Sequence, residues 1–203
     1  MKALPKRLLR LTVFAIAVTS LFCARPAQAF TITVEQMGSN VVWTGSGAIN
    51  LTGLNFIGPG IVVGSGINPA LAVINMVPGN ADTYAGITGP TSFGVGSVSF
   101  ASSFSGDVFA RNANGLLFLP VGYVSGNAIS DSMTFNNATF ASLGVTPGTY
   151  VWTWGTGLPN QNFTLIIGGA GVPDSGSTVF LLGFGLLGLA TLRRKLPLLK
   201  PIS

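Results

Sequence analysis

The sequence contains no histidine and only one cysteine, Cys23, which lies near the N-terminus. The absence of His excludes Ser-His-Asp and Cys-His catalysis and most transition-metal sites. The region 30–171 also lacks Lys, which excludes Ser-Lys dyads and Schiff bases there. Because this region has no Cys either, an exported domain formed by it must be held together by packing and sheet hydrogen bonds.

Charged residues are scarce, at 7% of the chain, against about 25% in ordinary soluble domains. Nine of the ten Lys and Arg residues lie in the first 29 or the last eleven positions, and Arg111 is the one between them. The basic character therefore belongs to the two ends, and the middle is acidic, with a net charge of −3. Nucleic-acid binding is excluded, because one Arg cannot neutralise several phosphates.

Four carboxylates remain as candidates for chemistry in the middle region: Glu35, Asp82, Asp107 and Asp131. A glycosidase needs two carboxyl groups about 5–10 Å apart, and nothing in the sequence brings any pair together. We therefore predict no catalytic residue and no cofactor. Calcium needs only oxygen ligands, which Asn80-x-Asp82 and Asp107 offer. The Asp-x-Asp-x-Asp loop is missing, so no metal site is assigned and calcium binding stays open.

The N-terminal 29 residues have the three parts of a secretory signal peptide. A basic stretch, 1–10, precedes an apolar stretch, Leu11–Ala24, and the small-x-small pattern Ala27-Gln28-Ala29 follows. A retained anchor is the alternative, but 14 apolar residues are short for a spanning helix, which needs about 20. We predict a signal helix read by Sec-type export machinery and cleaved by signal peptidase after Ala29, leaving Phe30 at the mature N-terminus.

The C-terminal region has a linker at 168–176, an uncharged apolar run and then Arg193-Arg194-Lys195. A helix over 177–195 approaches the length of the bilayer core, and its basic end should stay in the cytoplasm as a stop-transfer signal. Residues 196–203 then form a cytoplasmic tail. This topology places the middle region outside the inner membrane, in agreement with the signal peptide. A buried core helix is the alternative, but no polar residue interrupts the run.

Together, the motif Val172-Pro173-Asp174-Ser175-Gly176, the short apolar helix and the basic end resemble the C-terminal sorting signals of PEP-CTERM proteins, in their VPDSG form. The resemblance implies that an exosortase, a membrane-embedded transpeptidase-like enzyme, recognises the motif and moves the protein to the cell surface. The chain would then be an inner-membrane intermediate first and a surface or extracellular protein later. Residues 89–94 and 139–155 also resemble PEP-CTERM ectodomains, a resemblance that implies no catalytic residues.

The middle region, 30–167, has the pattern of a single all-β domain. Short β-prone runs occur at 41–43, 61–63, 71–74, 97–100, 116–119, 150–154 and 163–167. Turn formers separate them at 58–60, 78–80, 89–90, 112–115, 136–137 and 147–148. This spacing predicts an antiparallel β-sandwich of the jelly-roll kind. One short helical turn is expected within 138–143.

Trp152 and Trp154 share a strand face by period-2 alternation. On an exposed face they would form a platform for stacking sugar rings, and on the inner face they would belong to the core. We expect at least one of them in the core. The leading hypothesis is a non-enzymatic surface or extracellular-matrix protein, with exopolysaccharide as a candidate partner. A carbohydrate-binding or adhesion module is the alternative, and a polysaccharide hydrolase is less favoured.

Overall fold

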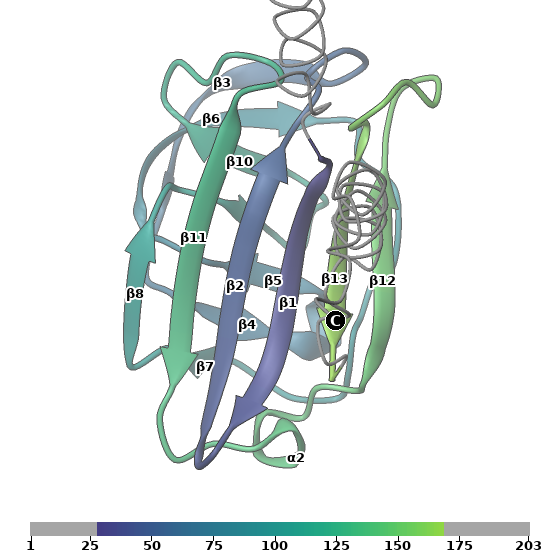
Figure 1. Cartoon of the computed structure of the whole chain (residues 1–203). Helices are drawn as coiled ribbons and strands as arrows, with labels where there is room; N and C mark the ends of the chain where they lie inside the picture. The colour runs from purple at the N-terminus through teal and green to yellow at the C-terminus, as the bar shows by residue number, and fades with distance from the viewer. Residues whose placement is uncertain (1–27, 169–203) are drawn as a thin grey trace, which may run out of the picture. The chain divides into compact units, whose positions relative to one another are not determined.

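The computed structural model describes residues 28–168, which form two β-sheets and confirm the predicted all-β class (Figure 1). Sheet A contains, in spatial order, β12 (Gly148–Thr153), β13 (Asn162–Ile167), β1 (Phe30–Met37), β2 (Asn40–Ala48), β11 (Ala128–Phe135) and β8 (Ser103–Gly106). Sheet B contains β3 (Asn55–Val62), β6 (Gly79–Ala85), β10 (Leu117–Pro120), β9 (Ala110–Arg111), β5 (Val73–Asn75), β4 (Gly66–Asn68) and β7 (Ser99–Phe100).

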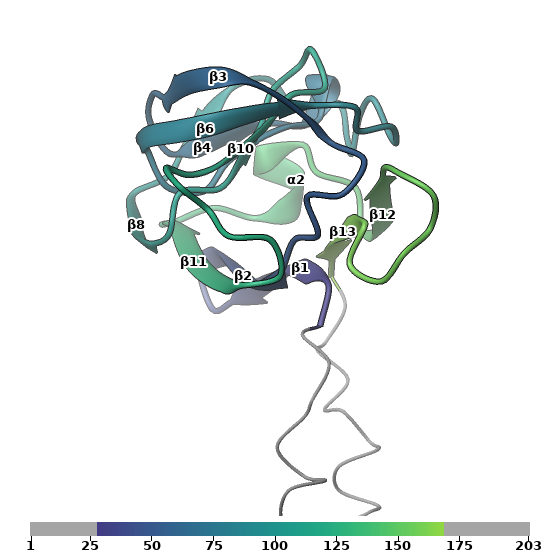
Figure 2. The same ribbon diagram turned by 90° about the horizontal axis from the view of Figure 1, so that it is seen from above.

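The two sheets pack face to face, with the strands of sheet B running crosswise behind those of sheet A (Figure 1). Seen from above, they are two separate layers with the core between them (Figure 2). This is the crossed arrangement of sheet packing, in which side chains from both inner faces interdigitate. The core includes Trp43, Phe93 and Phe109, which are all buried.

Alternating side chains explain why β1 and β13 form at the centre of this core. In β1, Phe30, Ile32 and Val34 are fully buried, and the threonines between them lie on the opposite face. β13 repeats the pattern with Phe163, Leu165 and Ile167. Burying each such side chain contributes about 1.5–3 kcal/mol, so these two strands are major contributors to the stability of the sandwich.

One strand pair departs from the predicted antiparallel jelly-roll pattern. β1 and β13 run parallel, with Phe30 opposite Phe163 and Val34 opposite Ile167. Parallel neighbours need a long crossover, and here the whole domain between β1 and β13 serves as that crossover. The first and last strands therefore lie side by side in the middle of sheet A, so the sandwich is incomplete until the C-terminal strand is in place.

Some local predictions were wrong, among them the expected turn Pro78-Gly79-Asn80, whose last two residues belong to β6. The expected turn Gly58-Pro59-Gly60 lies inside β3, one of the two edge strands of sheet B. Proline is tolerated there because an edge strand need not donate every hydrogen bond, and the pairing shifts register between Phe56 and Gly58. The expected strand 71–74 is also interrupted, since Pro69–Leu71 is a 3-10 helix, η1, and β5 begins only at Val73.

The predicted helical turn is confirmed as α2 (Phe140–Leu143). The Thr139 side chain accepts a hydrogen bond from the Ser142 amide at 3.1 Å, and the Ser142 hydroxyl accepts one from the Thr139 amide at 2.8 Å. This reciprocal capping satisfies two amides that a helix start leaves free. Gly144 ends the turn with a φ of +64°, a conformation that favours glycine.

Candidate functional site

The predicted signal junction abuts the first strand of the sandwich directly. Phe30, the predicted mature N-terminus, begins β1, is fully buried and stacks on Phe109 with ring centroids 4.3 Å apart. Ala29 pairs with Ala48 in an isolated bridge, and Ala27 lies outside the described residues. A signal peptidase cut after Ala29 would therefore keep the whole of β1, whereas a cut after Phe30 would remove a core ring.

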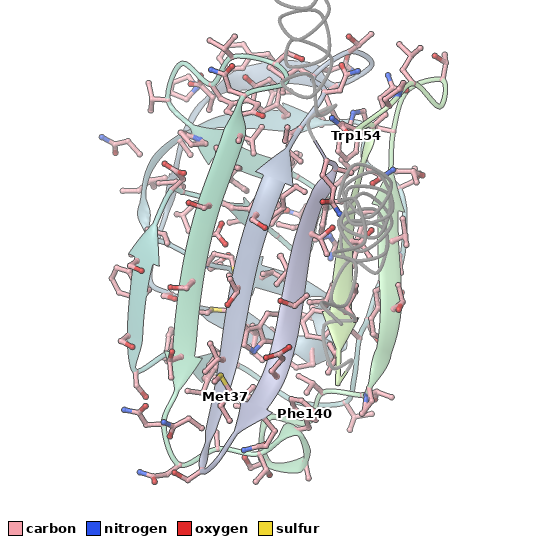
Figure 3. The ribbon with its side chains drawn as sticks, viewed as in Figure 1. Met37, Phe140 and Trp154 are labelled. Atoms are coloured by element: carbon pink, nitrogen blue, oxygen red, sulfur yellow. The ribbon has the colours of Figure 1, made fainter. Side chains whose placement is uncertain are left out.

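The chain leaves the sandwich at the opposite end of the β1/β13 pair. The Gly168 amide donates to the Val34 carbonyl at 3.0 Å, and Gly168 lies close to Phe140 and Pro147. Met37 and Phe140 mark this end, and Trp154 lies toward the other one (Figure 3). In the sequence, three residues, 169–171, separate Gly168 from the predicted motif, which begins at Val172.

The two candidate sugar-stacking residues, Trp152 and Trp154, both lie in the core. Trp152 is fully buried, and its ring stacks on Phe163 at 4.7 Å and 9°. Its indole N–H donates to the Pro90 carbonyl at 3.0 Å. Trp154 is 4% exposed, and its indole N–H donates to the Asn50 carbonyl at 2.7 Å. An exposed stacking platform formed by this pair is therefore wrong, since their shared face is the inner one.

Trp152→Phe should lower the free energy of unfolding by about 1–3 kcal/mol, because it loses ring volume and leaves the Pro90 carbonyl without its donor. Urea unfolding followed by fluorescence measures the change. Val151→Ala is the control: Val151 is the preceding residue of β12 and is 42% exposed, so its truncation should cost less than about 0.5 kcal/mol. Equal losses in the two variants would contradict the buried role of Trp152.

Arg111, the only basic residue of the middle region, points into the protein rather than toward a ligand. It is 5% exposed, and its Nη1 donates to the carbonyls of Leu71 and Ala72 at 2.9 and 2.8 Å. The guanidinium lies 5.7 Å from the centre of the Trp152 ring, and burial lowers the pKa of Arg111. Arg111 therefore ties sheet B to sheet A, a structural role.

Asp131 is a buried carboxyl group on the inner face of β11. It is 4% exposed, and neither carboxylate oxygen has a hydrogen-bond partner of ordinary geometry. Its cross-strand neighbours are Gly45 and Gly106, and a methyl group at Gly45 would overlap Oδ1 of Asp131 and crowd the Phe30 ring. Burial, reinforced by the charge of Asp107, raises the pKa of Asp131 to about 7, although the nearby Gly45 backbone opposes the rise.

Two further carboxylates, those of Asp82 and Asp107, bind backbone amides. Asp82 accepts a hydrogen bond from Gly122 at 2.8 Å, and Asp107 accepts one from Ser130 at 2.9 Å. The charge of Asp107 also contributes to raising the pKa of Asp131. Within residues 28–168, no group of three or more His, Cys, Asp or Glu side chains could hold a metal ion.

A pocket of about 490 Å³ lies at the junction of the two sheets. Its walls come from Gly86 and Thr88, which follow β6, and from Thr153 to Asn162, which link β12 to β13. An isolated bridge between Thr88 and Thr153 joins the two segments, with backbone hydrogen bonds of 2.9 and 2.8 Å. The sequence did not indicate this pocket, because its walls are about 65 positions apart in the chain.

A comparison with known protein families identifies one segment of the chain. Residues 171–196 match the VPDSG-CTERM motif. The chain carries a VPDSG-type PEP-CTERM sorting segment. The predicted resemblance is thereby confirmed at this segment, which implies processing by an exosortase and an exported protein. The chain has no match among curated proteins or solved structures.

The predicted targeting segments at the two ends lie outside the described residues. These are residues 1–27 of the signal peptide, the sorting motif Val172 to Gly176, the helix over 177–195 with its basic end Arg193 to Lys195, and the tail 196–203. Among residues 28–168, no helix is long and apolar enough to cross a membrane.

Proposed function

We propose that this chain is a non-enzymatic surface or extracellular-matrix protein, exported by its signal peptide and sorted by an exosortase. The observation that carries the proposal is the VPDSG-CTERM segment at 171–196, which begins three residues after the described sandwich ends at Gly168. In this account the apolar run anchors an inner-membrane intermediate, and recognition of the motif transfers the sandwich to the cell surface or beyond.

The absence of catalysis is part of the proposal and is supported by what the polar residues do. Arg111 and Asp131 are buried, and Asp82 and Asp107 bind backbone amides. A hydrolase would need two carboxyl groups converging on a substrate cleft. The pocket at the sheet junction has no carboxylate among its lining residues. These observations favour a structural or binding role over a polysaccharide hydrolase.

A chain truncated after Gly171 should bypass the membrane intermediate, because it keeps the signal peptide and the sandwich but lacks the anchor. Fractionation of the native host should find the full-length precursor in the inner membrane and its mature form at the surface. The truncated protein should instead appear in the soluble exported fraction without passing through the membrane. The same distribution for both chains would count against the sorting proposal.

Association with exopolysaccharide is the second part of the proposal, and a carbohydrate-binding module is the alternative primary role. The pocket beside Trp154 favours some binding function, because its volume lies within the range of small-ligand sites, about 300–1,000 Å³. Binding would have to use this pocket rather than a tryptophan platform, since Trp152 and Trp154 are buried.

A further inference from the structure

The pocket at the sheet junction has an uncharged lining. Its accessible side chains are the hydroxyls of Thr88 and Thr153, the half-buried amide of Asn162 and the apolar Leu158, while Trp154 and Gln161 also line it but are buried. The remaining lining residues are glycines, which leave backbone N–H and C=O groups accessible to a ligand. Such a site offers hydrogen-bond donors and acceptors beside an apolar wall, which are the features that orient a small polar ligand.

The pocket is held in shape by the buried side chain of Gln161, which is 3% exposed. Its Oε1 accepts hydrogen bonds from the amides of Thr156 and Leu158 at 3.0 and 2.7 Å, and its Nε2 donates to the Thr52 carbonyl at 2.6 Å. These bonds fix the 155–161 loop against the sandwich. The pocket is therefore pre-organised, and a wall that is fixed before binding lowers the entropy cost of binding a ligand.

Charge determines which class of ligand fits. No Lys or Arg lines the pocket to neutralise an anion, and residues 30–168 carry a net charge of −3. An acidic polymer would therefore be repelled. Nor does any carboxylate in the lining attract a cation. A neutral ligand rich in hydroxyl groups matches the threonine, amide and backbone groups, and a sugar ring also presents C–H faces to the apolar wall.

We propose that this pocket binds neutral sugar units of a polysaccharide, with Thr88, Thr153 and Asn162 as the contacting polar residues. The inference deepens the exopolysaccharide part of the proposed function and rests on it for its biological meaning. It also moves the sugar site away from the faces of Trp152 and Trp154, which are packed in the core. Gln161 acts as a positioning residue, because its hydrogen bonds hold the loop.

Calorimetry on the full-length protein in detergent tests the assignment, with neutral glucan and mannan oligosaccharides and with galacturonic acid oligomers as probes. At least one neutral probe should bind saturably, and the acidic oligomers should bind at least tenfold more weakly. The double variant Thr88→Ala, Asn162→Ala should bind the neutral probe at least tenfold more weakly than the wild type does. Thr149→Ala is the matched control, because Thr149 is exposed on β12 but does not line the pocket.

Unchanged binding in the double variant, a preference for the acidic oligomers, or no saturable binding of any neutral probe would overturn the assignment. The same variants expressed in the host separate this result from the sorting proposal. Pocket variants should still reach the surface, because the VPDSG-CTERM segment is intact. If the protein is sorted normally but binds no neutral sugar, only the assignment of the pocket is contradicted. If it binds the sugar but is not sorted, only the proposed export route is contradicted.

Discussion

Ionisation of Asp131 should destabilise the sandwich by up to about 4 kcal/mol, so that stability falls as the pH rises from about 4 to 7. The cause is burial first and the charge of Asp107 second, which together raise the pKa of Asp131 to about 7. Between these pH values the folded protein keeps a proton that the unfolded chain has lost. The stability contributed by the protonated form is therefore complete below about pH 4 and is lost as the pH passes 7.

Urea unfolding of residues 30–168 at pH 4.5, 7 and 8.5 measures this dependence. Asp131→Asn should flatten the profile, because the amide has no proton to lose in this range. Asp107→Asn should move the loss of stability to lower pH, since it removes a like charge. The chain has no His, so no other side chain ordinarily titrates between pH 5 and 8. A flat wild-type profile would refute the buried, unpaired state of Asp131.

Pro173→Ala should reduce C-terminal processing at least tenfold and leave the precursor in the inner membrane. Pro173 is the second residue of the motif Val172 to Gly176, inside the segment 171–196 that matches the VPDSG-CTERM model. Proline fixes φ near −65° and restricts the residue before it, so alanine changes the backbone preference at the centre of recognition. The measurement is the ratio of precursor to mature protein in a pulse-chase experiment.

The matched control for this experiment is Pro197→Ala, which removes a proline just beyond the matched residues 171–196. Pro197→Ala should be processed as the wild type is. Both variants leave the sandwich unchanged, so folding defects cannot explain a difference between them. Equal processing of the two variants would contradict a role of Pro173 in recognition of the VPDSG motif by the exosortase.

Some strands with continuous apolar or β-branched residues were predicted from the sequence, but β1 was not among the predicted runs. The runs 41–43 and 163–167 lie in β2 and β13, where each strand buries one full face. β11 was not predicted, because Ser130, Asp131 and Ser132 interrupt its apolar pattern. The sequence carries no sign that Asp131 points inward, since that depends on the space left by Gly45 and Gly106 across the sheet.

The candidate sites also differ in how far they could be predicted from the sequence. The terminal segments are local patterns, so the VPDSG-CTERM motif could be recognised from consecutive residues. Period-2 alternation placed Trp152 and Trp154 on one face, but only the packing against Phe163 and the partners of the two indoles identify that face as the inner one. The pocket depends on the Thr88–Thr153 bridge, a long-range contact that no local pattern encodes.

The most direct test of the central claim is the intact mass of the protein recovered from the cell surface or the medium of its native host. The account predicts a chain that begins at Phe30 and ends between Gly171 and Gly176, allowing for any group that the exosortase attaches there. An exported chain that still ends at Ser203 would contradict exosortase processing. A chain that begins at Met1 and stays inside the cell would contradict export itself.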